Sequence, residues 1–335
     1  MSDDIRLNFE DNPDFNNWLE ENYAVDIEDY SYPSSSVLYK ISVEDYFEAL
    51  ERYKSDPKVA LSRIENYFPT PIAYYFYQAG TGNNYQNDHH RLDLLKSCWE
   101  SIIFTLYGLV VGEARHRKIP LKSLGIKWDK YWSDKINNRL LIIENILDHV
   151  TKSGIRFDCA KVIPLSTVSL VRKLNQERNG FEHAFAKTSA QQQALYAELY
   201  PQLESVLRQL IKLEEVKLFR YYSAELPLYP KCEIFNGSSL EGWKEIITLQ
   251  KSNYIDILDY FNAGSVFAKV EEEAFCVSPF IHFHQEIHET NAVLCFFKQE
   301  KSGKYDYEVT SKSQKQQVEK SVFIKVTDDL RSLVV

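Results

Sequence analysis

The sequence predicts a mainly helical protein, in which a helical bundle precedes a smaller β-rich C-terminal region, so that the chain is α+β overall. Apolar residues recur at helical spacing over residues 89–118 and again in three later segments. Beyond residue 217, Gly, Pro and alternating β-branched or aromatic residues replace this period. A content of 44% hydrophobic and 14% aromatic residues is ample for a packed core and argues against disorder.

A chain of 335 residues exceeds a typical single domain, so we expect more than one structural unit. Composition and patterning divide it into an acidic N-terminal arm, a helical extension, a helical bundle and a β-rich C-terminal domain. The expected bounds are residues 1–36, 37–87, 88–216 and 217–335.

Capping signals predict the first helices. One short helix is expected near residues 15–21. Ser42, followed three residues later by Asp45, resembles a capping box. Asp56 and Pro57 predict the start of the next helix, which the prolines at 69 and 71 end, and residues 80–88 have the composition of a loop.

Four longer helices follow, and their connections suggest a bundle. They are expected at residues 89–118, 132–150, 165–174 and 189–213.

Five strands are then expected, with a turn at residues 301–304 and a partly helical stretch within residues 240–260. The strands are predicted at residues 265–270, 274–284, 292–298, 305–310 and 321–326.

Charge and cysteine usage restrict the function. A net charge of −9 does not suit a protein that coats long RNA, because phosphate neutralisation dominates such binding. A small recessed site for one or two phosphates remains compatible. Five scattered cysteines without a CxxC pair indicate reduced thiols in a cytoplasmic protein. No secretory signal or membrane span is expected.

One hexapeptide at residues 178–183 indicates a chemistry. It contains Arg178, followed at once by Asn179, and then His183. Histidine can transfer a proton near neutral pH, and arginine offers a permanently charged planar fork to a phosphate. Asparagine can hold either side chain by a hydrogen bond. These residue types suit RNA cleavage without a metal.

The motif and the surrounding helix order resemble the HEPN family (higher eukaryotes and prokaryotes nucleotide-binding), whose signature is Arg, four to six residues, then His, often with Asn after the Arg. The resemblance covers roughly residues 88–215. It implies an all-helical ribonuclease that needs no cofactor, acts as a homodimer with a composite site, and leaves a 2′,3′-cyclic phosphate. It also implies a bacterial toxin or anti-phage defence effector, with a regulatory or antitoxin protein as a further partner.

Geometry leaves two arrangements of this site open. On an ideal helix, five steps of about 100° separate Arg178 from His183 by roughly 140°, so the two do not share a face. Either the helix is broken at the motif, or two chains bring their motifs into one cleft, as the resemblance implies. Glu182 can orient a histidine or cap the helix.

Three other patterns have structural and functional interpretations. The first pattern is a basic run that contains Arg115, Arg117 and Lys118. These residues can contact RNA, or they can simply end a long helix, where positive side chains interact favourably with the helix dipole. The aromatic run at residues 74–77 can stack bases or pack in a core. A metal site could use three histidines near two cysteines, although an ordinary strand explains the run equally well. These residues are His282, His284, His288, Cys276 and Cys295.

Two functions therefore compete. The first is a metal-independent HEPN-type endoribonuclease that cuts RNA. The second is a catalytically inactive HEPN-like adaptor or regulatory protein that works by dimerisation and partner binding, which the acidic net charge favours. The acidic N-terminal arm could also cover the site as a phosphate mimic.

Overall fold

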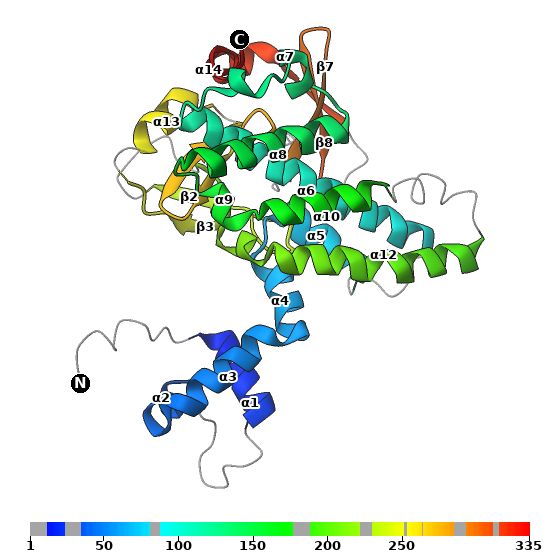
Figure 1. Ribbon diagram of the computed structural model, residues 1–335, viewed down its shortest axis with the longest axis vertical. Coiled ribbons are helices and arrows are strands. Elements are labelled where there is room, and N and C mark those ends of the chain that lie inside the picture. The colour runs from blue at the N-terminus through cyan, green and yellow to red at the C-terminus, as the bar shows by residue number, and fades with distance from the viewer. Residues whose placement is uncertain are drawn as a thin grey trace. The chain divides into compact units, whose positions relative to one another are not determined.

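A computed structural model describes most of the chain as helices followed by two small sheets (Figure 1). Contacts divide the chain into two compact units, Met1–Ser62 and Arg63–Val335. The described residues are 12–23, 35–80, 88–176, 188–221, 230–250, 253–262, 264–284, 293–310 and 315–335.

The first unit has a small aromatic core of its own. Phe15 and Leu19 on the first helix pack against Tyr46 and Tyr53 on the third. The predicted cap is present, since Ser42 accepts a hydrogen bond from the Asp45 amide. The helix expected near residues 15–21 is therefore confirmed, and it packs in a core rather than standing apart. The helices are α1 (Pro13–Tyr23), α2 (Ser35–Ile41), α3 (Val43–Ser55) and α4 (Pro57–Tyr67), which continues into the second unit.

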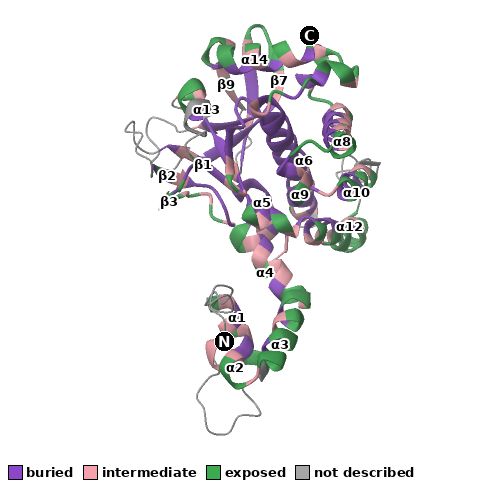
Figure 2. Ribbon diagram, turned by 60° about the vertical axis from the view of Figure 1, so that its left-hand side comes forward, coloured by how far each residue is buried: buried purple, intermediate pink, exposed green. Residues whose placement is uncertain are grey.

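The second unit is built around α6 (Asp88–His116), which contacts three neighbouring helices. Its neighbours are α5 (Thr70–Gly80), α8 (Ile136–Ser153) and α12 (Ser189–Gln209), while α10 (Leu165–Gln176) packs against α8 and α12. Figure 2 shows that α6 is almost entirely buried. Although α6 is long and apolar enough to cross a bilayer, 89% of its most apolar window is buried inside the protein, as in a core helix.

Short helical elements lie mostly in the connections between the expected helices. Residues 128–131 form a separate turn, and α8 begins at Ile136 rather than near residue 132. The Ser133 side chain accepts hydrogen bonds from the Lys135 amide and from Asn138, which fixes a turn there. The short elements are η2 (Leu121–Leu124), α7 (Trp128–Tyr131), α9 (Cys159–Val162) and η4 (Ile211–Glu215).

In the part of the chain that the structure describes, nine strands form two antiparallel sheets with the orders β3-β2-β1-β4-β5 and β6-β7-β8-β9. The first sheet contains β1 (Lys217–Tyr221), β2 (Lys231–Ile234), β3 (Trp243–Ile246), β4 (Phe267–Val270) and β5 (Glu273–Cys276). The second contains β6 (Ile281–His284), β7 (Val293–Lys301), β8 (Lys304–Val309) and β9 (Lys315–Glu319). The general prediction of a mainly helical chain with a C-terminal β-rich region is therefore confirmed.

Two strand predictions are wrong in detail. The run expected at residues 274–284 is divided between two sheets, because Pro279 lacks the amide hydrogen that a continuing ladder requires. The strand expected at residues 321–326 is instead η5 (Lys320–Phe323) leading into α14 (Ile324–Val334). Val326, Leu330 and Val334 recur at helical spacing and are buried. The stretch at residues 240–260 contains both β3 and α13 (Asn253–Tyr260).

Two glycines one turn apart let the sheets pack directly on α6. A Cβ on Gly108 would lie 2.9 Å from the Ile281 side chain. A Cβ on Gly112 would lie 2.9 Å from the Cys276 carbonyl oxygen. The bundle and both sheets therefore share one core, which places them in one compact unit.

Candidate functional site

The candidate catalytic residues Arg178, Asn179, Glu182 and His183 lie outside the described residues. The described chain ends at Gln176 of α10 and resumes at Thr188, the N-cap of α12. The site can therefore be characterised by the described residues around its two ends.

The two helices that the motif segment joins, α10 and α12, pack against the N-terminal half of α6. The Trp99 indole donates a hydrogen bond to the Val171 carbonyl at 3.3 Å, so α10 approaches α6 along its middle. Leu95 and Trp99 also share a small apolar cavity with Leu174, near the end of α10, and with residues of α12. In Figure 1, α12 runs alongside α6 and α10.

At this end of the bundle, Arg91 lies over an aromatic ring. Its guanidinium carbon is 3.8 Å from the centroid of Tyr196 on α12. The Tyr196 hydroxyl donates to the Ala79 carbonyl at 2.7 Å, so the ring is fixed between α5 and α12. An arginine held flat in this way loses little further side-chain freedom when it binds an anion. His89 and His90 precede Arg91 in the sequence, and His89 contacts Asp93 at 3.2 Å.

A complete capping box begins α12. The Thr188 side chain accepts a hydrogen bond from the Gln191 amide, and the Gln191 side chain accepts one from the Thr188 amide. This arrangement satisfies orphan amides at the helix start and defines where the chain leaves the motif segment. Thr188 and Ser189 are exposed, so α12 begins at the surface.

The basic run at the other end of α6 is used within the protein. Arg115 is 4% exposed and donates to the carbonyls of Ser278 and Cys276, with Tyr260 under its guanidinium. Arg117 is largely buried against carboxylates. Of the three residues considered for RNA contact, only Lys118 is exposed. The guanidiniums of Arg115 and Arg117 therefore have structural partners in place of RNA.

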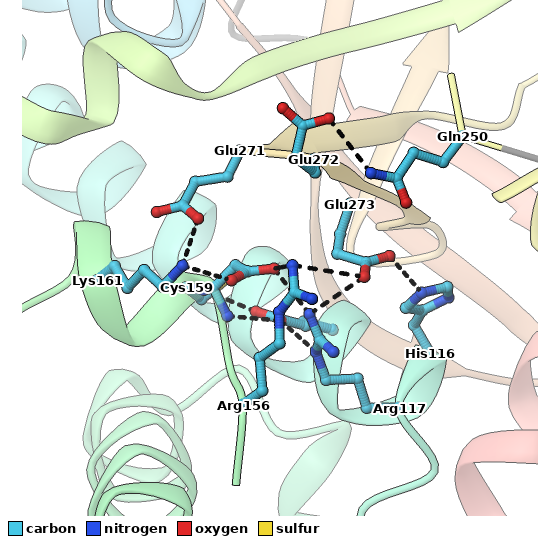
Figure 3. Close-up of polar contacts among 11 residues, drawn as sticks. His116, Arg117, Arg156, Cys159, Lys161, Gln250, Glu271, Glu272 and Glu273 are labelled. Carbon is cyan, nitrogen blue, oxygen red and sulfur yellow. Dashed lines mark hydrogen bonds and ion pairs between the residues drawn. The ribbon is translucent and has the colours of Figure 1, made fainter. Parts of the chain in front are cut away.

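Figure 3 shows the charge network that contains Arg117. Glu113 is fully buried and accepts hydrogen bonds from the amides of Asp158 and Cys159, each at 2.7 Å. Arg117 donates to Glu113 at 2.6 Å and to Asp158 at 2.7 Å. Glu273 of β5 lies 3.7 Å from Arg117. The network joins α6, the start of α9 and the first sheet.

The outer part of the same network is more exposed. Arg156 lies 3.6 Å from Asp158, and Lys161 forms ion pairs with Asp158 and Glu271. These lysine and arginine side chains form ion pairs with acidic groups that the fold brings together. Within the basic run, Arg117 thus receives carboxylate partners from residues far away along the chain.

The described histidines do not assemble a metal centre. His282 is buried against Tyr307 and Phe323, and burial lowers its pKa to about 4. Its ring also lies against Gly264. No cluster of three His, Cys, Asp or Glu side chains suited to a metal occurs in the part of the chain that the structure describes, and His288 lies outside it.

The aromatic run at residues 74–77 lies on α5, where its members point in different directions. Phe76 is buried and stacks on Tyr200 of α12, with centroids 5.8 Å apart and planes at 7°. Tyr74 and Tyr75 contact each other edge to face and are half-buried. Packing explains Phe76, and no described contact favours a base-stacking platform.

Sequence reasoning missed a cleft of about 310 Å³ between the bundle and the second sheet. Acidic residues line it, among them Glu100 and Glu308, which both pair with Lys298. Arg139 is buried nearby, donates to the carbonyls of Phe297 and Lys298, and has a pKa that burial lowers to about 10. The lining carboxylates help to stabilise this buried cation, which gives them a structural role.

Comparisons with protein-family models, with curated proteins and with solved structures found no match to this chain.

Proposed function

We propose that this chain is a metal-independent endoribonuclease of the HEPN type. The observation that carries the proposal is the motif of Arg178, Asn179 and His183 in the segment that joins α10 to α12. The helices α10 and α12, which that segment joins, pack against the N-terminal half of α6, and Arg91 of α6 is held over Tyr196 of α12. A cation fixed in this way supports an RNA-binding end of the bundle.

The division of charge between the two units also supports the proposal. Residues 1–62 contain 5 Lys or Arg and 15 Asp or Glu, whereas the rest of the chain contains 34 and 33. The unit that carries the motif therefore has a formal charge near +1, and the acidic excess belongs to the first unit. The overall charge of −9 is thus no argument against phosphate binding by the second unit.

In the proposed reaction the RNA supplies its own nucleophile. A base removes the proton of a 2′-hydroxyl, whose oxygen attacks the adjacent phosphorus, and the bond from phosphorus to the 5′ oxygen breaks. An acid protonates that leaving oxygen, so the products are a 2′,3′-cyclic phosphate and a 5′-hydroxyl. His183 carries out proton transfer, and Arg178 stabilises the charge of the phosphorane.

A homodimer supplies the second proton-transfer group. Because Arg178 and His183 do not share a face of a regular helix, two copies of the motif in one cleft place a base and an acid on opposite sides of the phosphate. Asn179 orients one of these side chains, and Glu182 has a supporting role. The proposed setting is the cytoplasm, with a toxin or anti-phage role.

The first test is cleavage of total bacterial RNA in EDTA by the full chain and by His183→Ala and Arg178→Ala. We expect cuts with cyclic phosphate ends from the unaltered chain and none from either variant. His149→Ala on α8 and Lys173→Ala on α10 are matched controls that should cut normally. Equal cleavage by all five proteins would contradict the proposal.

Mixing His183→Ala with the unaltered chain tests the composite site. A mixed dimer keeps only one of the two histidines that act as base and acid. We expect cleavage by an equal mixture to fall below half of that of the unaltered chain alone. Cleavage in proportion to the amount of unaltered chain, in a mixture that forms mixed dimers, would place the whole site within one chain.

The alternative is an adaptor that binds a partner without turnover. The open strand edge described below is the structural feature that favours it. Absence of cleavage by the unaltered chain, with dimerisation intact, would favour this alternative.

A further inference from the structure

The first sheet ends in a short strand with large apolar side chains in solvent. Strand β3 is the terminal strand of that sheet and pairs only with β2. Trp243 is 42% exposed and Ile246 is 56% exposed. Among the residues that the structure describes, no segment is paired with the outer side of β3. Such an edge is a template for an added strand.

The backbone of β3 directs two residues outward. The Ile247 amide donates to the Pro230 carbonyl of the neighbouring strand at 3.2 Å. In an antiparallel ladder, alternate residues point their amide and carbonyl groups to the same neighbour. The amide and carbonyl groups of Lys244 and Ile246 therefore point away from β2, and they can form ladder hydrogen bonds with an additional strand.

A row of alternating charges crosses the sheet and ends at this edge. Arg220 of β1 lies opposite Glu233 of β2, and its guanidinium donates to that carboxylate at 2.6 Å. Glu233 lies opposite Lys244 of β3. The row thus alternates positive, negative and positive, so an acidic residue in the next strand would continue it.

An apolar row ends at the same edge on the other face. Phe219 lies opposite Ile234, and both are fully buried. Ile234 lies opposite Trp243, which is the exposed end of the row. An apolar side chain in the next strand would cover the indole and complete the row.

A second copy of this chain does not fit the edge. In a closed two-fold pair, directly opposed residues lie on the same face, so their numbers are both odd or both even. The two registers that pair most of β3 therefore place Lys244 opposite its own copy, or Glu245 opposite its own copy. Like charges directly opposite destabilise an antiparallel pair.

We propose that β3 binds an extended segment of a partner protein as an added antiparallel strand, with an acidic side chain opposite Lys244 and apolar side chains opposite Trp243 and Ile246. The backbone hydrogen bonds of the ladder provide the affinity. The charged row and the apolar row determine the register in which the added strand pairs with β3. This inference does not depend on ribonuclease activity, and it gives the β-rich region a partner-binding role.

The test uses the full chain and two dye-labelled peptides in fluorescence anisotropy. The matching peptide is Thr-Ile-Thr-Glu-Val-Thr, whose antiparallel alignment places Ile opposite Ile246, Glu opposite Lys244 and Val opposite Trp243. The control peptide replaces Glu with Lys. We expect the matching peptide to bind at least about fivefold more tightly, at concentrations up to ~1 mM.

Three variants of β3 separate backbone from side-chain effects. Ile246→Pro removes an outward amide and should abolish binding, whereas Ile246→Val keeps the amide and should bind. Lys244→Glu should reverse the preference between the peptides. Near-ultraviolet circular dichroism checks folding, and Lys244→Glu decides the test if the proline variant does not fold.

Several results would overturn the inference. They are no binding of the matching peptide, equal binding of both peptides, or binding that neither Ile246→Pro nor Lys244→Glu changes. Self-association of the unaltered chain that Ile246→Pro abolishes would assign the edge to a second copy instead.

Discussion

The arginines at the two ends of α6 have different surroundings. At its C-terminal end, Arg115 donates to backbone carbonyls and Arg117 to the carboxylates of Glu113 and Asp158. At its N-terminal end, Arg91 lies half-exposed over the ring of Tyr196. The C-terminal cations hold the fold together, while Arg91 lies against α12, one of the two helices that the motif segment joins.

This contrast shows why a basic run is a poor guide to a nucleic-acid surface. The run at residues 115–118 is the most conspicuous one near the bundle, yet Arg117 pairs with Asp158 and Glu273, and Arg115 donates to buried backbone carbonyls. Arg91 belongs to no basic run, and only the packing of α12 on α6 reveals its setting. Spatial neighbours, rather than local sequence, decide whether a cation is available to a ligand.

Removal of the buried carboxylate at the C-terminal end should have the largest effect. Glu113→Ala removes the acceptor of two buried amides and one of the carboxylates that pair with Arg117, so we expect the free energy of unfolding to fall by about 3–5 kcal/mol. Urea denaturation measures this loss. Asp148→Ala breaks an exposed ion pair with Lys152, and its free energy of unfolding should be nearly that of the unaltered chain. Equal stability of the two variants would show that the network is not structural.

The pH of that measurement matters because of His282. Burial lowers its pKa to about 4 from an ordinary value near 6.5, so the unfolded state binds a proton that the folded state excludes. Stability should therefore fall as pH drops from about 6.5 to about 4, by roughly 3 kcal/mol. Denaturation of His282→Phe across this range should show a weaker pH dependence. The comparison of α6 variants is best made above pH 7.

Arginine substitutions at the two ends should separate stability from binding. Arg115→Gln removes charged donors from two buried carbonyls, and we expect a loss of about 2 kcal/mol in the free energy of unfolding. Arg91→Gln should leave stability nearly unchanged. It should weaken binding of a labelled single-stranded RNA several-fold and reduce the salt dependence of binding by about one phosphate contact. Unchanged RNA binding by Arg91→Gln would remove Arg91 from the proposed surface.

A methyl group between α6 and the first sheet tests how tightly the C-terminal half is packed. Gly112→Ala would place a Cβ 2.9 Å from a backbone oxygen that cannot move without shifting β5, and we expect it to cost about 1–3 kcal/mol. In Gly108→Ala the nearest atom belongs to the Ile281 side chain, which can adjust. In thermal unfolding, Gly112→Ala should therefore have a lower melting temperature than Gly108→Ala.

The smallest effect is expected at the N-terminal end. Tyr196→Phe removes the hydroxyl, which donates to the Ala79 carbonyl and also interacts with Arg91, and it keeps the ring under Arg91, so the loss should be about 1 kcal/mol. RNA binding should be unchanged in this variant, because the ring face remains. A large loss of binding would mean that the hydroxyl itself contacts RNA.

The sequence predicted the long helices because their apolar periods and caps are local. The helix α10 and the start of α12 lie where they were expected, and Ser42 caps α3 as predicted. The strands β1 to β3 were not predicted, because runs of four or five residues carry little periodicity. The run at 321–326 alternates like a strand, yet its apolar residues also fit the helical period that α14 adopts.

The candidate site was likewise predicted only in part from the sequence. The motif was recognised from adjacent residues, and its catalytic role stays a prediction. The partners of Arg115 and Arg117 were beyond local inference, since Asp158 is 41 residues from Arg117 and Ser278 is 163 residues from Arg115. The edge at β3 depends on sheet order, which no pattern within a four-residue strand can reveal.

All five cysteines are buried, and they lie on α6, α9, β2, β5 and β7 of the second unit, with none in the first. Burial raises the pKa of the Cys232 and Cys295 thiols to about 12, so few thiolates are present at neutral pH. A thiol-reactive dye should therefore label the native chain only when the bundle or a sheet opens. The chain thus carries five built-in reporters of local opening in one unit, and a single cysteine introduced into the first unit could be labelled selectively.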